Sequence, residues 1–202
     1  MKELVPWKVT QLALIACLTL CIATGASAFD GNRKGFILGG DLGLGLTSFT
    51  QTVEFLGTST TSDRENKFAV MTDFKIGYGA TEQVLVYYTN KVSWFSLENV
   101  LGENVIIVNG VGGVGMTYFF QPVAPSPYIL GELGLSTWNA PFEEGSEGWY
   151  GFGLAVGAGY EFSRHWSIEG NLTWGKPGKE VGGVKASSNA LSLMVTINAL
   201  AY

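Results

Sequence analysis

Several stretches of this chain place a large apolar residue at every second position and glycine or a small polar residue between. The clearest stretch covers residues 149–163. Side chains that repeat every two residues lie on one face of a β-strand. One face would carry Tyr150, Phe152, Leu154, Val156, Ala158, Tyr160 and Phe162, and the other Gly151, Gly153, Ala155, Gly157, Gly159, Glu161 and Ser163. The pattern therefore predicts a strand with one bulky and one nearly bare face.

The same division recurs along the chain and predicts eight strands, at residues 36–47, 67–79, 83–96, 104–120, 127–139, 149–163, 165–174 and from 189 onward. Short links near 80–82, 121–127 and 163–165 alternate with longer polar links near 51–66, 97–103, 140–148 and 175–188. Transmembrane barrels have short turns at the periplasmic rim and long loops outside. The order predicts an all-β fold, an eight-stranded antiparallel up-and-down transmembrane β-barrel.

Volume decides which face of each strand meets the membrane. The interior of an eight-stranded barrel is only just wide enough to be filled by side chains. Turning the bulky faces inward, as in a soluble barrel, would overfill that space and leave a glycine-lined surface in water. Turning them outward places the apolar side chains in lipid and the small residues in the crowded interior. We therefore expect the barrel to lie in a membrane.

Aromatic residues gather near both ends of the predicted strands, as in the interfacial girdles of outer-membrane barrels. The predicted girdle consists of Tyr78, Tyr118, Tyr160 and Trp166 beside the short turns, and Trp94, Trp138, Trp149 and Trp174 beside the long loops.

The first residues predict export. Lys2 and Lys8 precede an apolar run at 12–23, and an Ala-x-Ala ending follows at 26–28. This is the pattern of a cleavable signal peptide over residues 1–28, with the barrel at 29–202. Cys17 in a lipobox-like context leaves lipoprotein processing as an alternative. With cleavage after Ala28, both cysteines leave with the leader.

The remaining chain would carry ten Lys and Arg against sixteen Asp and Glu, because Lys2, Lys8 and Glu3 belong to the leader. This acidic balance disfavours nucleic acid as a partner.

Two segments carry a resemblance to a known family. Residues 157–162 (Gly-Ala-Gly-Tyr-Glu-Phe) and, after a tight turn, 166–174 precede a terminal strand that ends in aromatic Tyr202. From Leu12 to Tyr202 the chain resembles the bacterial outer-membrane β-barrel domain family, the small barrels related to the OmpA transmembrane domain and OmpX. The resemblance implies an integral protein of the cell outer membrane. It also implies that Tyr202 marks the end used by the assembly machinery, although Asn198 and Thr196 interrupt the usual apolar series.

Seven charged residues are predicted to face inward: Asp41, Asp73, Lys75, Lys91, Glu132, Glu161 and Glu169. Charges inside a narrow barrel must be paired or hydrated. We expect a plug of ion pairs in which the two lysines meet Asp41, Glu132 and Glu169; a gated ion path along the same groups is the alternative.

Nothing in the sequence indicates a catalytic, metal or cofactor site. The single histidine, His165, falls in a predicted periplasmic turn, and Ala186 stands where a lipid A deacylase would carry its histidine near Ser188. A serine without a general base is not activated.

The sequence thus predicts a monomeric, non-enzymatic barrel with a structural or surface-interaction role. Its expected partners are outer-membrane lipid and lipopolysaccharide, reached through acidic loops and through Lys176, Lys179 and Lys185. A small channel or hydrophobic-ligand conduit is the alternative, followed by a lipid A-modifying enzyme.

Overall fold

The computed structural model describes residues 31–98, 102–143 and 145–202, so the predicted signal peptide lies outside the described residues. These residues form nine β-strands: β1 (Gly35–Phe55), β2 (Thr58–Thr61), β3 (Glu65–Gly79), β4 (Val84–Glu98), β5 (Asn104–Phe119), β6 (Ser126–Asn139), β7 (Trp149–Ser163), β8 (Trp166–Val181) and β9 (Val184–Ala201). Among them no helix is long and apolar enough to span a membrane.

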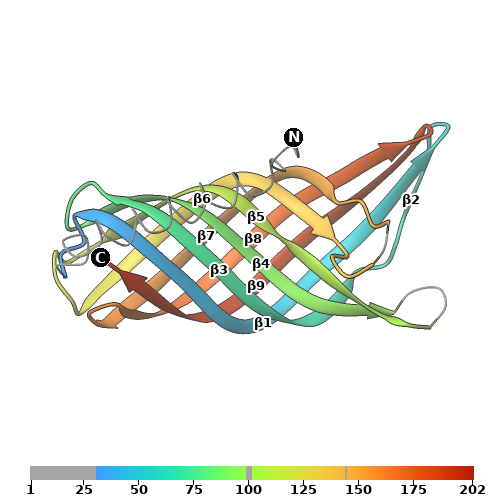
Figure 1. Cartoon of the computed structure of the whole chain (residues 1–202). Coiled ribbons are helices and arrows are strands. Elements are labelled where there is room, and N and C mark those ends of the chain that lie inside the picture. Colours follow the sequence, from blue (N-terminus) through green and yellow to red (C-terminus); the bar gives the residue numbers. More distant parts are fainter. Residues whose placement is uncertain (1–30, 99–101, 144) are drawn as a thin grey trace, which may run out of the picture.

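Eight of the strands close into a ring. Each long strand pairs antiparallel with the next along the chain, and β1 pairs with β9 to complete the barrel. The strands are tilted and wind around a common axis, as Figure 1 shows. Closure pairs the backbone of every long strand on both sides, which the hydrocarbon region of a membrane requires. The predicted up-and-down barrel is confirmed.

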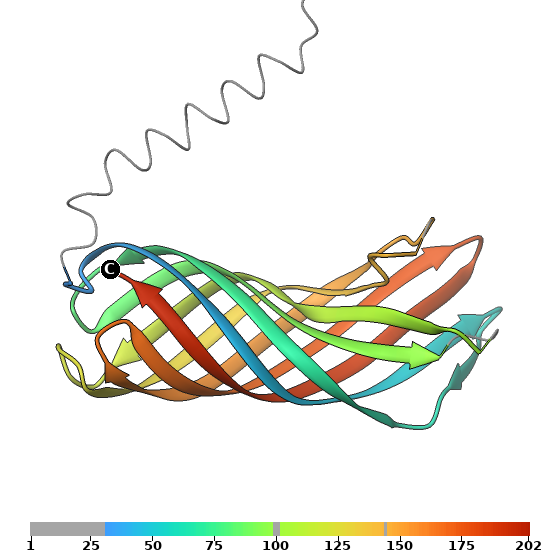
Figure 2. The ribbon, with the colours of Figure 1, turned by 60° about the horizontal axis from the view of Figure 1, so that its bottom comes forward.

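The two ends of the barrel differ. The chain terminus at Tyr202 lies at the end with the three short turns, which we call the turn end (Figure 1). At the opposite loop end, the hairpin of β8 and β9 and the hairpin of β1 and β2 project beyond the ring (Figures 1 and 2).

Two of the predicted long loops are strands instead. Residues 51–66 form the upper part of β1, then β2 and the start of β3, while 175–188 continue β8 and β9 up to a two-residue turn at Gly182 and Gly183. Both turn glycines have positive φ, as the tight hairpin turn requires. The polar composition that suggested loops reflects strands that stand in water on both faces.

The side chains confirm the inside-out arrangement. Large apolar residues such as Leu42 and Leu193 are more than 60% exposed on the outer face, although they lie in the middle of long strands. The opposite faces carry buried Thr47, Asn171 and Ser192. Small residues fit the narrow interior, and glycine pairs such as Gly113 and Gly134 let neighbouring strands approach where a Cβ atom would meet backbone.

Candidate functional site

The interior of the barrel is filled by three layers of side chains stacked along its axis. An apolar layer lies toward the loop end, an ion layer lies in the middle, and an aromatic layer lies toward the turn end. The apolar layer consists of Phe49, Ala69, Met71, Phe95, Ile107, Trp138, Ala190 and Met194. The aromatic layer consists of Ile37, Leu85, Tyr87, Phe119, Tyr128, Leu130 and Tyr202.

The ion layer joins six of the seven predicted inward charges: Asp41, Asp73, Lys75, Lys91, Glu132 and Glu169. Lys75 Nζ lies 3.1 Å from Asp41 Oδ2, 3.5 Å from Asp73 Oδ2 and 3.5 Å from Glu169 Oε2. The six side chains come from β1, β3, β4, β6 and β8, so the cluster crosses the whole barrel.

Lys91 is the centre of the ion layer. It is fully buried, and its Nζ lies 3.0 Å from Glu169, 3.3 Å from Glu132, 3.6 Å from Asp73 and 4.0 Å from Asp41. One ammonium group therefore contacts four carboxylates, which come from four different strands: β1, β3, β6 and β8. Removing it would leave buried charges without compensation.

The ion layer contains four carboxylates but only two ammonium groups. Neutral hydrogen-bond donors help to stabilise the excess negative charge. Tyr128 donates its hydroxyl to Glu169 Oε2 at 2.9 Å, and Thr89 donates to Asp73 Oδ1 at 2.8 Å. Hydrogen bonds to ionised groups are the stronger kind. These contacts connect the ion layer to the aromatic layer beneath it.

Glu161 stands apart from the ion layer. Its carboxylate forms a buried ion pair with Arg33, a residue that precedes β1, and accepts a hydrogen bond from the Tyr202 hydroxyl at 2.8 Å. Pairing by Arg33 did not emerge from the sequence, because Arg33 lies outside the alternating stretch that marks the first strand. The sequence offers one indication of such a partner: Glu161 is predicted to face inward, and no lysine is predicted to pair with it.

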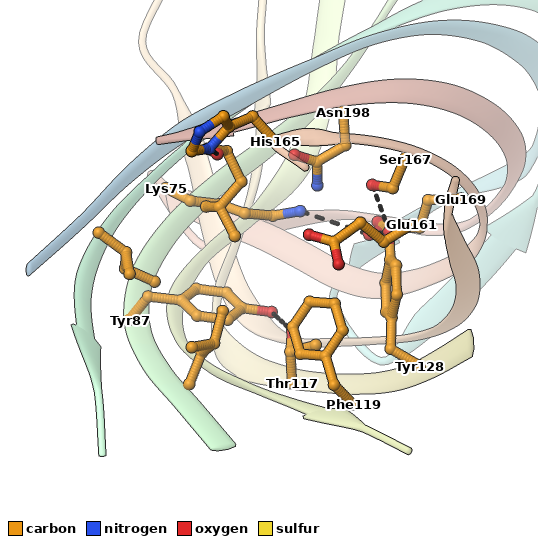
Figure 3. A pocket seen from close by; sticks show the side chains of 13 residues that line it. Lys75, Tyr87, Thr117, Phe119, Tyr128, Glu161, His165, Ser167, Glu169 and Asn198 are labelled. Atoms are coloured by element: carbon orange, nitrogen blue, oxygen red, sulfur yellow. Dashed lines mark hydrogen bonds and ion pairs between the residues drawn. The ribbon is translucent and has the colours of Figure 1, made fainter. Parts of the chain in front are cut away.

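A small cavity lies between Glu161, the partner of Arg33, and the ion layer (Figure 3). Its volume is about 20 Å³, and its walls include Lys75, Glu161, Glu169, His165 and Asn198. That volume holds a water molecule, given polar partners. The single histidine contributes to its rim through the β7–β8 turn, where Nδ1 donates to the carbonyl of Leu200 at 2.9 Å.

Six of the eight residues of the predicted aromatic girdle lie on the outer face of the barrel and two do not; their contact with the membrane interface stays a prediction. Tyr78, Tyr118, Tyr160 and Trp166 are exposed on the outer face near the turn end. Near the loop end, Trp94 and Trp174 are partly exposed and donate their indole N–H groups to Thr72 and Asn189 at 2.8 Å.

Trp138 and Trp149 lie on the interior side instead. Trp138 is buried in the apolar layer against Phe49 and Phe95, and Trp149 packs against it with ring centroids 6.4 Å apart. The reason is strand parity: Trp138 is six residues from Glu132 and so shares its inward face.

Tyr202 is also turned inward. It is buried in the aromatic layer, and its ring lies 4.6 Å from the ring of His165. Tyr202 follows the last strand at the rim, where burial and the hydrogen bond to Glu161 raise the pKa of its phenol to about 12. Its use by the assembly machinery stays a prediction.

No group of three or more metal-ligating side chains gathers within the described part of the chain. His165 and Ser188 lie at opposite ends of the barrel, since His165 is in the β7–β8 turn and Ser188 is near the loop end of β9. Ser188 and His165 are therefore too far apart for this histidine to activate this serine.

A closed ring with an apolar outer face and charges turned inward is the architecture of an integral outer-membrane β-barrel. The fold and its interior place this chain in that class.

Solved structures of this class are similar to it. Neisserial surface protein A is 13% identical, with a TM-score of 0.45, and the alignment covers 81% of this chain and 96% of that one. OprG from Pseudomonas aeruginosa is 11% identical, with a TM-score of 0.47, and the alignment covers 84% of this chain and 97% of that one. The outer membrane protease OmpT from Escherichia coli is 10% identical, with a TM-score of 0.44, and the alignment covers 81% of this chain and 96% of that one. These are likenesses of fold alone. No protein-family model and no curated protein sequence matches the chain.

Proposed function

We propose that this chain is a structural or surface-interaction protein of the outer membrane, closed to ions and without catalytic activity. The observation that carries the proposal is the ion layer, in which Lys75 and Lys91 are held by four carboxylates across the full width of the barrel. The apolar layer above it and the aromatic layer below it add two further barriers. A water-filled pore would instead need a polar lumen with open cross-section.

Conductance across a planar bilayer tests the closed interior. The refolded protein, checked by the separate migration of its unboiled form on a gel, should give no steady single-channel openings. Lys91→Ala is the matched variant, because it removes the central cation of the ion layer while leaving the outer face unchanged. Steady openings in the unaltered protein would contradict the closed barrel and favour a channel.

The projecting hairpins supply the surface for interaction. Their charges are mixed: Lys179 pairs with Glu147, and Lys185 stands opposite both Glu54 and Glu180 in the strand register. We propose contact with lipopolysaccharide, by Lys176 directly with phosphate and by the loop acids through divalent cations.

Vesicles test this contact. The protein should bind lipopolysaccharide-containing vesicles more tightly than phosphatidylcholine vesicles, and chelation of divalent cations should weaken the difference. Equal binding to both vesicles would contradict a role for lipopolysaccharide.

A hydrophobic-ligand conduit is the second candidate, and the apolar layer favours it. Phe49, Phe95 and Trp138 pack there with Met71 and Met194, and methionine adapts readily to ligands of different shape. An alkane-bearing fluorescent probe that quenches tryptophan in the unaltered protein, but less in Trp138→Leu, would support this candidate. Unchanged tryptophan fluorescence at saturating probe would exclude it.

We propose no catalytic activity, because Ser188 and His165 lie at opposite ends of the barrel. Incubation with lipid A should leave the mass of lipid A unchanged, and a mass change would contradict this part of the proposal.

A further inference from the structure

We propose that Arg33 and Glu161 form a latch that separates the interior cavity from solvent at the turn end, and that the mouth opens when this ion pair breaks. The inference goes beyond the closed, surface-interacting barrel proposed above and does not depend on its surface role.

The contacts of Arg33 are those of a side chain that holds the mouth shut. It is 1% exposed, and its Nη1 donates to the carbonyl oxygens of Glu82 and Gln121, each at 2.9 Å. Its Nη2 pairs with Glu161, and its guanidinium lies 3.9 Å from the ring centre of Phe119. One side chain thus joins the β3–β4 turn, the β5–β6 connection and strand β7.

Tyr202 extends the same assembly to the remaining turn. Its hydroxyl donates to Glu161, and its main-chain oxygen accepts a hydrogen bond from the amide of Gly31 at 3.1 Å. His165 in the β7–β8 turn packs against the Tyr202 ring. The three turns and the two ends of the described chain are therefore tied together around one ion pair.

Arg33 lies outside the strand ladder of the barrel. It precedes β1, so no strand pairing depends on its backbone, and its amide donates instead to the Glu82 carboxylate at 2.9 Å. Gly31 and Gly35 flank it with φ values of +84° and +122°, conformations that glycine adopts without strain and that suit a hinge. Gly35 has open space where a Cβ would stand, so backbone conformation alone explains this glycine.

The cavity behind the latch is suited to water. Asn198 lines it and is 5% exposed, and its Oδ1 has no hydrogen-bond partner among the described residues. Lys75 Nζ and the Ser167 hydroxyl supply donors on the other walls (Figure 3). A buried carbonyl oxygen is normally satisfied by protein or by ordered water. Opening the latch would join this cavity to the periplasm, while the ion layer still closes the barrel beyond it.

The reactivity of a single thiol tests the latch. Asn198→Cys, in a full chain with Cys17→Ser and Cys21→Ser, places one thiol in the cavity wall; the measurement is its rate of modification by a small cationic methanethiosulfonate. Losing hydrogen bonds to a charged group should raise this rate roughly 10- to 100-fold in Arg33→Ala. Arg33→Lys should restore part of the protection, and Arg164→Ala, an exposed arginine at the same rim, should leave the rate unchanged.

Two results would overturn the latch: equal rates with and without Arg33, or an equal rise in Arg164→Ala. If Arg33→Ala does not fold, Glu161→Gln decides, because it keeps the shape of the side chain but removes its charge. Conductance separates this inference from the proposed function. Arg33→Ala should expose the thiol and still conduct no ions, whereas openings in the unaltered protein would contradict the closed barrel and leave the thiol assay valid.

Discussion

Replacing Lys91 by methionine should destabilise the barrel strongly. Lys91 is the only ion-pair partner of Glu132 within the described residues, whereas Asp41, Asp73 and Glu169 keep Lys75 at 3.1 to 3.5 Å. One buried carboxylate is thereby left without a counter-ion. Removing one partner of a buried pair costs about 3–5 kcal/mol of unfolding free energy. We expect a loss in that range for Lys91→Met.

A double-mutant cycle identifies the cause of that loss. Glu132→Gln removes the charge that Lys91→Met leaves behind, so the double variant should lose about 1–3 kcal/mol less than the sum of the single variants. Unfolding in urea, followed by tryptophan fluorescence of protein refolded in lipid vesicles, gives the free energies.

Lys67→Met is the matched control for Lys91→Met. Lys67 pairs with Glu65 at 3.2 Å, but both side chains are at least one-third exposed, so the loss should stay below about 1 kcal/mol. Equal losses for Lys67→Met and Lys91→Met, or strictly additive effects of Lys91→Met and Glu132→Gln, would refute the account of the ion layer.

Three further predictions follow from other parts of the barrel. Trp138→Ala should cost about 3–5 kcal/mol because it empties the apolar layer, whereas Trp166→Ala, on the half-exposed outer face, should cost less; urea midpoints compare them. Leu44→Arg should cost about 2–4 kcal/mol in vesicles because it places a charge in the acyl region, and a neutral effect there would mean that this face does not meet lipid. Raising the pH from 10 to 12 should reduce stability, because the folded pKa of Tyr202, about 12, exceeds the ordinary value of 10.0. The stabilisation is complete below pH 10 and is lost as pH rises through 12, so Tyr202→Phe should flatten this part of the stability curve.

The alternating pattern was sufficient to predict the ring. Where a strand is regular, as at 149–161, the parity of one residue fixes the face of all the others. The inward position of Asp41, Lys75 and Glu169 follows in the same way. The prediction is wrong where it relies on polar composition instead of alternation. Residues 175–188 suggest a loop because strands that project into water carry no apolar face.

The remaining errors concern contacts between distant parts of the chain. The prediction places Trp138 in the girdle because it lies near a strand end, although its spacing from Glu132 puts it on the inner face. Arg33 could not be paired from spacing, because it is 128 residues from Glu161 and lies before the first strand. Alternation predicts which face of a strand each residue occupies. Only the closed barrel shows which turns a side chain such as that of Arg33 can reach.

The ion layer also bears on how the barrel selects its register. A buried ion pair contributes little net stability compared with apolar packing, so its value here must be sought in specificity. Shifting β4 by one residue would turn Lys91 from the interior to the lipid face, since successive residues point to opposite faces. A lysine near the bilayer midplane costs about 2–4 kcal/mol, and the carboxylates left inside would lose their cation as well. A strand that carried only glycine and leucine would tolerate a one-residue shift more easily. The charges at the centre therefore penalise every odd-numbered shift of the strands that carry them, and this penalty is greatest at Lys91, where four carboxylates converge.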